Sequence, residues 1–307
     1  MTTNATPALS LDKQGHAREM VLLLVLATLW GASYSFIKIG VETIPPVTLI
    51  AARTLIAGAI LLVVIRLRGL ALPRDFAIWR RFAIQACLNS AIPFTLIAWA
   101  ETSVDAGLAA ILNAGSPIFA FLLSMLLFRA EAASGRKLFG VAAGMLGVCL
   151  IIGVEALSGF GRELMAQLAL VAAAACYGGA ALFGRSFKGL DPIMPAAGSL
   201  ICGAAILVPL SLVFDRPWAL SPSPESIQAL LALAVFSTAL AFIIYFRLID
   251  RLGTVGATSV AYLRVPTGVA IGVVFLGEQL SPTAWVGLAL VVLGVVAMTL
   301  PARSKPV

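Results

Sequence analysis

The sequence predicts an all-α polytopic membrane protein with ten transmembrane helices, arranged as two inverted five-helix repeats. Three observations lead to this prediction: an apolar composition, ten separate apolar runs, and an internal repeat at an offset near 147 residues. Of the 307 residues, 61% are hydrophobic and 11% are charged, whereas an ordinary soluble domain carries roughly 25% charged residues. So few charged side chains cannot cover a soluble globule of this size, and we expect lipid to surround most of the chain.

Each transmembrane helix is predicted from an apolar run that is bounded by charged residues, proline or glycine. A bilayer core about 30 Å thick needs about 20 helical residues. In chain order, the runs are approximately 21–37, 47–65, 82–99, 107–128, 138–154, 164–184, 193–214, 227–246, 255–276 and 284–300. The loops between them hold roughly five to a dozen residues, which leaves no room for a second, soluble domain.

The basic residues divide unevenly between the two sides that this alternation defines. Sixteen of the 21 lie on one side, three (Lys38, Arg162 and Arg216) on the other, and Arg53 and Arg264 inside apolar runs. Because cytoplasmic loops retain Lys and Arg, we expect the side with sixteen to be cytoplasmic and to hold both termini. The predicted domains are a cytoplasmic tail at 1–19, repeats at 20–154 and 155–300, and a second cytoplasmic tail at 301–307.

The two halves of the chain match each other in order. The matched positions include Trp30 with Tyr177, Lys38 with Arg185, and Pro45 with Pro192 at an offset of 147, and Glu101 with Asp250 and Pro117 with Pro266 at 149. Chance coincidence in apolar sequence is the alternative, but the matches keep their order through both halves. Because five crossings are an odd number, the halves enter the membrane in opposite directions. Secondary transporters follow this plan, with a substrate site between the repeats near the midplane.

Small residues recur at four-residue or similar spacing in the fifth and tenth runs. They are Gly140, Gly144 and Gly147 in the fifth run, and Gly287 and Gly294 in the tenth. Such spacing is typical of helices that pack closely in a membrane, so we expect a structural role for these glycines.

Several short motifs carry a family resemblance. The chain contains Trp30-Gly31 with Lys38 seven residues on, Pro45-Pro46 followed by Arg53, the stretch 109–117, and Gly277-Glu278 at the end of the ninth run. Over roughly residues 20–300, this order resembles the drug/metabolite transporter superfamily and, within it, the ten-helix EamA family. The chain also looks like bacterial inner-membrane exporters of amino acids of the YddG type, which are linked to efflux of toxic compounds. The resemblance implies export of small metabolites across a bacterial inner membrane.

Arg264 lies near the middle of the ninth run, where its charge is costly unless it has a partner or water. Pro266 follows it, and Pro117 takes the matching position in the first half. A proline frees the carbonyl four residues earlier, and broken helices survive only beside a cavity. We therefore expect a substrate cavity bordered by Asn113, Ser116, Tyr262 and Arg264, with Pro117 and Pro266 as hinges of its gates. The alternatives are packing kinks at the prolines, and snorkelling or a static backbone bond at Arg264.

Aromatic residues in the apolar runs supply a wall for the predicted cavity. The candidates are Trp30, Tyr34, Trp99, Tyr177 and Tyr245. Their rings attract an ammonium group, while the guanidinium of Arg264 holds a carboxylate. Together these groups fit a zwitterion with a hydrophobic side chain. Tyr and Trp also gather in interfacial belts, which is the alternative for these positions, Trp99 included.

Arg53 lies closer to the end of its run, about ten ångströms from the non-cytoplasmic surface at 1.5 Å per residue. We expect it to reach the interface or to pair with Glu42 or Glu101, with a direct substrate role as the alternative. All acidic residues lie near run ends. The sequence therefore favours neither a carboxylate proton relay nor a site for a bare organic cation at the midplane.

The sequence predicts a transporter rather than an enzyme. The only histidine, His16, lies in the polar tail, and the usual zinc protease, serine hydrolase and Walker A strings do not occur. We expect no metal, no cofactor and no nucleic-acid partner. The predicted protein is a monomer in the lipid bilayer that exports small amphipathic metabolites, amino acids first and toxic analogues or drugs besides, by alternating access. A lipid or other metabolite flippase and a channel are the alternatives.

Overall fold

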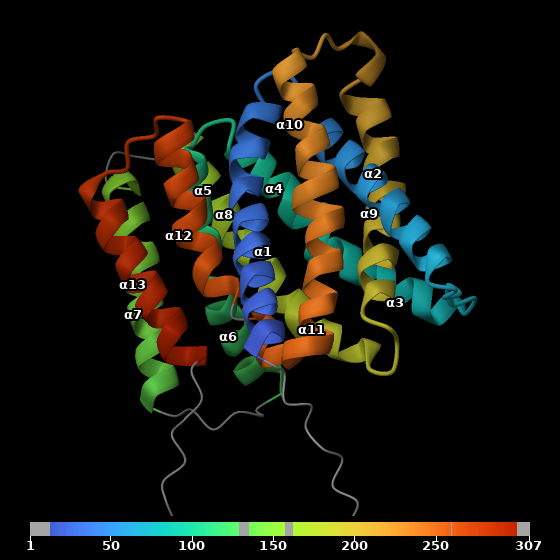
Figure 1. The fold of residues 1–307 in the computed structure, drawn as a ribbon. Coiled ribbons are helices and arrows are strands. Elements are labelled where there is room, and N and C mark those ends of the chain that lie inside the picture. Colours follow the sequence, from blue (N-terminus) through green and yellow to red (C-terminus); the bar gives the residue numbers. More distant parts are fainter. Residues whose placement is uncertain (1–12, 129–134, 157–161, 259, 300–307) are drawn as a thin grey trace, which may run out of the picture.

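A computed structural model describes residues 13–128, 135–156, 162–258 and 260–299, which form helices with short connections (Figure 1). Seven of the helices in these ranges are long and apolar enough to cross a membrane. Three shorter apolar helices accompany them, Leu138–Ile151, Leu263–Phe275 and Pro282–Ala297. The predicted fold class, an all-helical membrane protein with ten spans, is therefore confirmed.

The first repeat contains five spans. The first two are α1 (Lys13–Gly40) and α2 (Pro46–Leu67), and the fifth is α7 (Gly135–Ala156). The third runs without a break through α3 (Phe76–Ala86), the π-helical segment η1 (Cys87–Ala91) and α4 (Ile92–Ala100). The fourth is divided into α5 (Ala106–Asn113) and α6 (Ser116–Phe128). Helix α1 thus extends into the segment predicted as the tail at 1–19.

The second repeat has the same five spans. They are α8 (Arg162–Phe183) with the short 3-10 turn η2 (Gly184–Phe187), α9 (Ile193–Phe214), the eighth span of α10 (Pro224–Ala234), η4 (Val235–Leu240) and α11 (Ala241–Thr258), then α12 (Val260–Phe275) and α13 (Pro282–Thr299). Helix α11 continues well past residue 246, the predicted end of its run. An apolar run indicates only the part of a helix that lies in lipid. The helix itself continues beyond the run, because residues such as Arg247 and Arg251 have a high helix propensity.

The contacts between helices follow the pseudo-two-fold relation of the repeats: a contact between two helices recurs between their counterparts in the other repeat. Helix α1 packs on α12, and its counterpart α8 packs on α6; likewise α8 packs on α4, and α1 packs on α11, the counterpart of α4. The pairs α2 with α9 and α7 with α13 each join equivalent helices and lie at opposite edges of the bundle (Figure 1). This pattern is what two inverted copies that face each other produce.

The α7–α13 contact confirms the structural role predicted for the glycines. A Cβ atom added at Gly147 would lie 2.8 Å from the main-chain oxygen of Gly287, and one at Gly294 would lie 2.5 Å from that of Gly140. Both distances are too short for any side chain, so the two helices touch backbone to backbone.

The two repeats also share a π-helical segment. Segment η1 lies within the third span and η4 within the eighth, at positions about 148 residues apart. Each packs on the second helix of the other repeat, η1 on α9 and η4 on α2. Single-turn π segments within α-helices frequently occur at functional sites. Because they lie in equivalent places, the segments mark a shared feature of the interface between the repeats.

The two prolines predicted to break helices behave differently. The fourth span is interrupted at Ala114 and Gly115, and the Oγ of Ser116 donates to the free carbonyl of Asn113 at 2.7 Å. Helix α12, in contrast, continues through Pro266. The hydroxyl of Thr267, the residue after this proline, lies within hydrogen-bond distance of the main-chain oxygens of Leu263 and Arg264, at 2.7 and 2.9 Å. The predicted matching break in the second half is thus wrong.

Candidate functional site

A cavity of about 1010 Å³ lies between the two repeats. We call the end of the bundle at which α1 begins the open end, and the end at which α1 terminates at Gly40 the sealed end. The cavity reaches the exposed residues Lys188 and Gly189, in the connection from α8 to α9 at the open end. It extends inward to Ile37 and Ile97, which are buried near the sealed end.

Most of the predicted site residues are brought together around this cavity. Its lining includes Trp30, Tyr34, Arg53, Ser116, Pro117, Tyr177, Tyr245 and Arg264. They come from α1, α2, α6, α8, α11 and α12. The cavity is therefore shared by both repeats, as expected for an inverted-repeat carrier.

Three predicted site residues do not line the cavity, and a fourth lies outside the described residues. Trp99 is 40% exposed on the outside of α4, where a tryptophan suits the interfacial belt. Asn113 is completely buried beside the helix break, and its main-chain oxygen accepts a hydrogen bond from the hydroxyl of Ser116. Pro266 is exposed and is not among the residues that line the cavity. The side chain of Tyr262 is outside the part that the structure describes.

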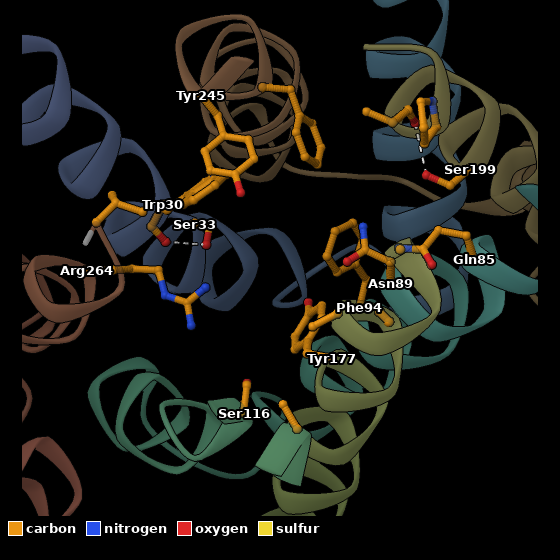
Figure 2. Close-up of a pocket in the computed structure, with 18 of the residues that line it drawn as sticks. Trp30, Ser33, Gln85, Asn89, Phe94, Ser116, Tyr177, Ser199, Tyr245 and Arg264 are labelled. Carbon is orange, nitrogen blue, oxygen red and sulfur yellow. Dashed lines mark hydrogen bonds between the residues drawn. The ribbon is translucent and has the colours of Figure 1, made fainter. Parts of the chain in front are cut away.

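Arg264 points into the open space of the cavity (Figure 2). In this view its guanidinium faces the gap between Ser33, Tyr245, Tyr177 and Ser116, which come from four different helices. No ion pair between described residues involves Arg264. The cationic head is thus available to a ligand.

The sequence predicted that Arg53 reaches the membrane interface. The structure instead buries it against the second repeat. Its Nε donates to the Oγ1 of Thr238 in η4 at 2.9 Å, and its Cζ lies 3.8 Å from the centroid of the Phe94 ring. Among the described residues it forms no ion pair with Glu42 or Glu101, so that predicted pairing is wrong. A cation–π contact and a hydroxyl hold the guanidinium at the cavity wall instead.

The two guanidinium groups belong to one electrostatic environment. The phenols of Tyr34 and Tyr177 each interact with both Arg53 and Arg264. Lys188 adds a third cation at the exposed mouth, and none of the described lining residues is acidic. The cavity is therefore cationic, and an anionic group of a ligand has no competing carboxylate inside it.

Aromatic rings form the rest of the wall in two groups. Trp30 packs on Tyr245 and Phe242 with centroids 5.3 and 6.3 Å apart, and Phe94 packs on Tyr177 at 6.3 Å. Each group joins one helix of the first repeat to one of the second, α1 with α11 and α4 with α8. Rings on both sides of the cavity suit a flat or apolar ligand part between them.

Sequence reasoning missed several lining residues. They are Ser33, Lys188 and Ser199, the polar pair Gln85 and Asn89, and the rings Phe94, Phe242 and Phe246. Gln85 and Asn89 stand four residues apart in an apolar run, a spacing that places two amides on one helix face and was available as a signal. The phenylalanines carry no such signal, because each looks like any lipid-facing residue of its helix.

Glu278 closes the sealed end. Its carboxylate accepts the main-chain amides of Ala106 and Gly107 at 2.7 and 2.8 Å, and so caps the first turn of α5 from the other repeat. A Cβ atom at Gly272 would clash with this carboxylate. Gly277 has a φ of +68°, a value that favours glycine and turns the chain back toward α5. The Gly277-Glu278 motif therefore has a structural explanation.

Comparison with known proteins agrees with this geometry. The chain is 30% identical to the inner membrane transporter YedA of Escherichia coli strain K12 over 281 residues, 91% of this chain and 89% of the relative. It is 27% identical to protein PagO of Salmonella typhimurium over 94% of each chain. A solved crystal structure has the same fold, with a TM-score of 0.64 and 19% identity over 94% of this chain and 99% of that one.

A family model matches both halves of the chain. The model of the EamA-like transporter family aligns with residues 17–153 and again with residues 164–300. The two matches coincide closely with the two sets of five spans, and the cavity lies between them. The chain therefore belongs to the EamA-like transporter family and is a multi-pass membrane transporter built from two EamA repeats.

Proposed function

We propose that this transporter exports small amphipathic metabolites, above all amino acids with aromatic or other hydrophobic side chains, by alternating access. The observation that carries the proposal is the pair Arg53 and Arg264 in an aromatic cavity with no acidic residue among its described lining. A guanidinium binds a carboxylate through two parallel hydrogen bonds. The Trp30 and Tyr245 rings supply an apolar contact and attract an ammonium group.

The size of the cavity supports a small-molecule ligand. Its volume of about 1010 Å³ lies at the upper end of the roughly 300–1,000 Å³ of typical small-molecule sites. An amino acid leaves room for water in this space, and larger toxic analogues or drugs fit as well. The resemblance of the sequence motifs to amino-acid exporters of the YddG type favours the same substrate class.

The distribution of basic residues supports a bacterial inner-membrane location with a cytoplasmic open end. Sixteen of the 21 Lys and Arg residues lie on the predicted side of the two termini. A cavity that is accessible from the cytoplasm and capped by Glu278 at the other end suits an exporter that is about to load its substrate. Pro117, beside the break between α5 and α6, is proposed as the hinge of one gate, and Pro266 as that of the other.

Reconstitution into proteoliposomes tests the proposal. Radiolabelled amino acids are expected to exchange with an unlabelled internal pool, with saturation and with competition among apolar amino acids. Ala181 and Ala172 both lie exposed on α8, but only Ala181 lines the cavity. Ala181→Trp should therefore block exchange, while Ala172→Trp, the matched control, should not.

The same assay separates the alternatives. Flux that does not saturate would indicate a channel. Movement of a fluorescent lipid between leaflets, without exchange of any amino acid, would indicate a flippase. Either result, or equal inhibition by Ala181→Trp and Ala172→Trp, would contradict an amino-acid carrier with its site in this cavity.

A further inference from the structure

The carboxyl group of Glu101 is buried without a partner. Glu101 follows α4 at the sealed end, directly after the third span, and its exposed fraction is 0%. Neither of its two carboxyl oxygens forms a hydrogen bond. An ionised carboxylate in such a place would lose its hydration without gaining a hydrogen bond, so burial favours the neutral, protonated form of the group. Its position at the end of an apolar run gave no sign of this burial.

The ammonium group of Lys38 binds main-chain oxygens beside the Glu101 carboxyl. The Nζ of Lys38, on α1, donates to the main-chain oxygen of Glu101 at 2.8 Å and to that of Val104 at 2.7 Å. Lys38 thus ties α1 to the loop after α4 without forming an ion pair with the Glu101 carboxyl. The ammonium also occupies the carbonyl oxygens that a sodium ion at this carboxyl would need, which argues against a metal-ion site.

Other charged groups face Glu101 from the surrounding elements. Glu278, from the connection after α12, and Arg53, from α2, both interact with it electrostatically, as does Lys38. Glu278 already accepts two amides of α5, so its carboxyl group is held in place near Glu101. Two more charged residues belong to this region. Asp105 lies in the same loop as Glu101, and Arg162 of α8 donates to the hydroxyl of Thr102 in that loop at 3.3 Å.

We propose that Glu101 is a proton-binding site whose occupancy is coupled to the closure of the sealed end. The proposal rests on the alternating access of the proposed function, because it requires that this end also opens. When the end opens, water reaches the carboxyl, its O–H bond breaks, the carboxylate keeps the electron pair and the proton passes to water. Since the closed form binds one proton more than the open form, acidity favours closure and alkalinity favours opening.

Infrared spectroscopy of the purified protein tests the proton directly. A protonated carboxyl absorbs above the amide I band, and the frequency shifts in heavy water. We expect such a band in the wild-type protein, its absence in Glu101→Gln, and its retention in Glu42→Gln, a matched control that is exposed at the same end. A wild-type spectrum that lacks the band, or an unchanged spectrum in Glu101→Gln, would overturn the proposal.

Cysteine accessibility tests the coupling. With the four native cysteines replaced, Val104→Cys places a thiol at a buried position of the sealed end. Labelling by a membrane-impermeant maleimide, corrected for the thiolate fraction of an exposed reference cysteine, is expected to rise by up to about tenfold per pH unit, the limit for one linked proton. In Glu101→Gln the corrected rate should be slow and independent of pH, and in Glu101→Asp the pH dependence should return.

Both measurements work without a substrate. A failure of amino-acid exchange would therefore remove the proposed substrates and leave the proton site standing. A corrected labelling rate with the same pH dependence in wild type and Glu101→Gln would remove the proton site and leave the substrates standing. Sodium-dependent labelling at constant pH would assign the carboxyl to a metal ion and would also overturn the proposal.

Discussion

Replacement of Arg264 by alanine removes the charge that points into the centre of the cavity. The side chain makes no ion pair with the described residues, and it faces open space rather than packed atoms (Figure 2). We therefore expect Arg264→Ala to insert and fold normally, with the melting temperature in detergent close to that of the wild type. Any loss of transport is then a property of the site.

The size of the loss follows from the bonds that are removed. A hydrogen bond to a charged group contributes about 1.5–3 kcal/mol, and about 1.4 kcal/mol changes a dissociation constant tenfold. Loss of the Arg264 interaction with a carboxylate should therefore raise the Kd of an apolar amino acid by about tenfold to about a hundredfold. Arg264→Lys should fall between the two, because an ammonium keeps the charge but not the planar fork.

Equilibrium binding of a radiolabelled amino acid, with counterflow in proteoliposomes, measures this effect. The amine that corresponds to the amino acid without its carboxylate serves as the control ligand, and its affinity should not fall in Arg264→Ala. An unchanged Kd for the amino acid, or an equal loss for the amino acid and the amine, would refute the assignment of Arg264 to the carboxylate.

Four further predictions address the other parts of the structure. Arg53→Met keeps the contact with Phe94 but loses the bond to Thr238, and should weaken amino-acid binding about tenfold or more if both guanidinium groups hold the ligand, as equilibrium binding would show. Glu278→Gln removes the negative charge from the α5 cap, a change of about 1 kcal/mol, and should raise maleimide labelling at Val104→Cys about fivefold; unchanged labelling would contradict the sealing role. Gly294→Ala forces α7 and α13 apart and should cost about 1–3 kcal/mol in a detergent unfolding assay, whereas Gly135→Ala, with open space around it, should not. Pro117→Ala should slow exchange more than Pro266→Ala, because only the first proline lies at a helix break; equal effects would argue against that break as a hinge.

The sequence identified the candidate cavity through the residues that are unusual in lipid. Arg264 stands out in an apolar run, and the aromatic residues Trp30, Tyr177 and Tyr245 recur near it in the two repeats; all four line the cavity. Trp99 fits the same pattern but is exposed, because a periodic apolar helix does not reveal which face meets protein and which meets lipid. Phe94 illustrates the reverse case, since nothing local marks it as the partner of Arg53.

The sequence by itself determined the number, order and apolar extent of the spans and the packing role of the glycines in α7 and α13. These properties depend on composition and spacing along one helix, which lipid makes strict. Only the tertiary structure decided the surroundings of single charges. Arg53 meets Thr238 across 185 residues of chain, and Glu278 meets Gly107 across 171. Such contacts have no local signature, and a carboxyl like that of Glu101 is buried or hydrated according to what packs over it.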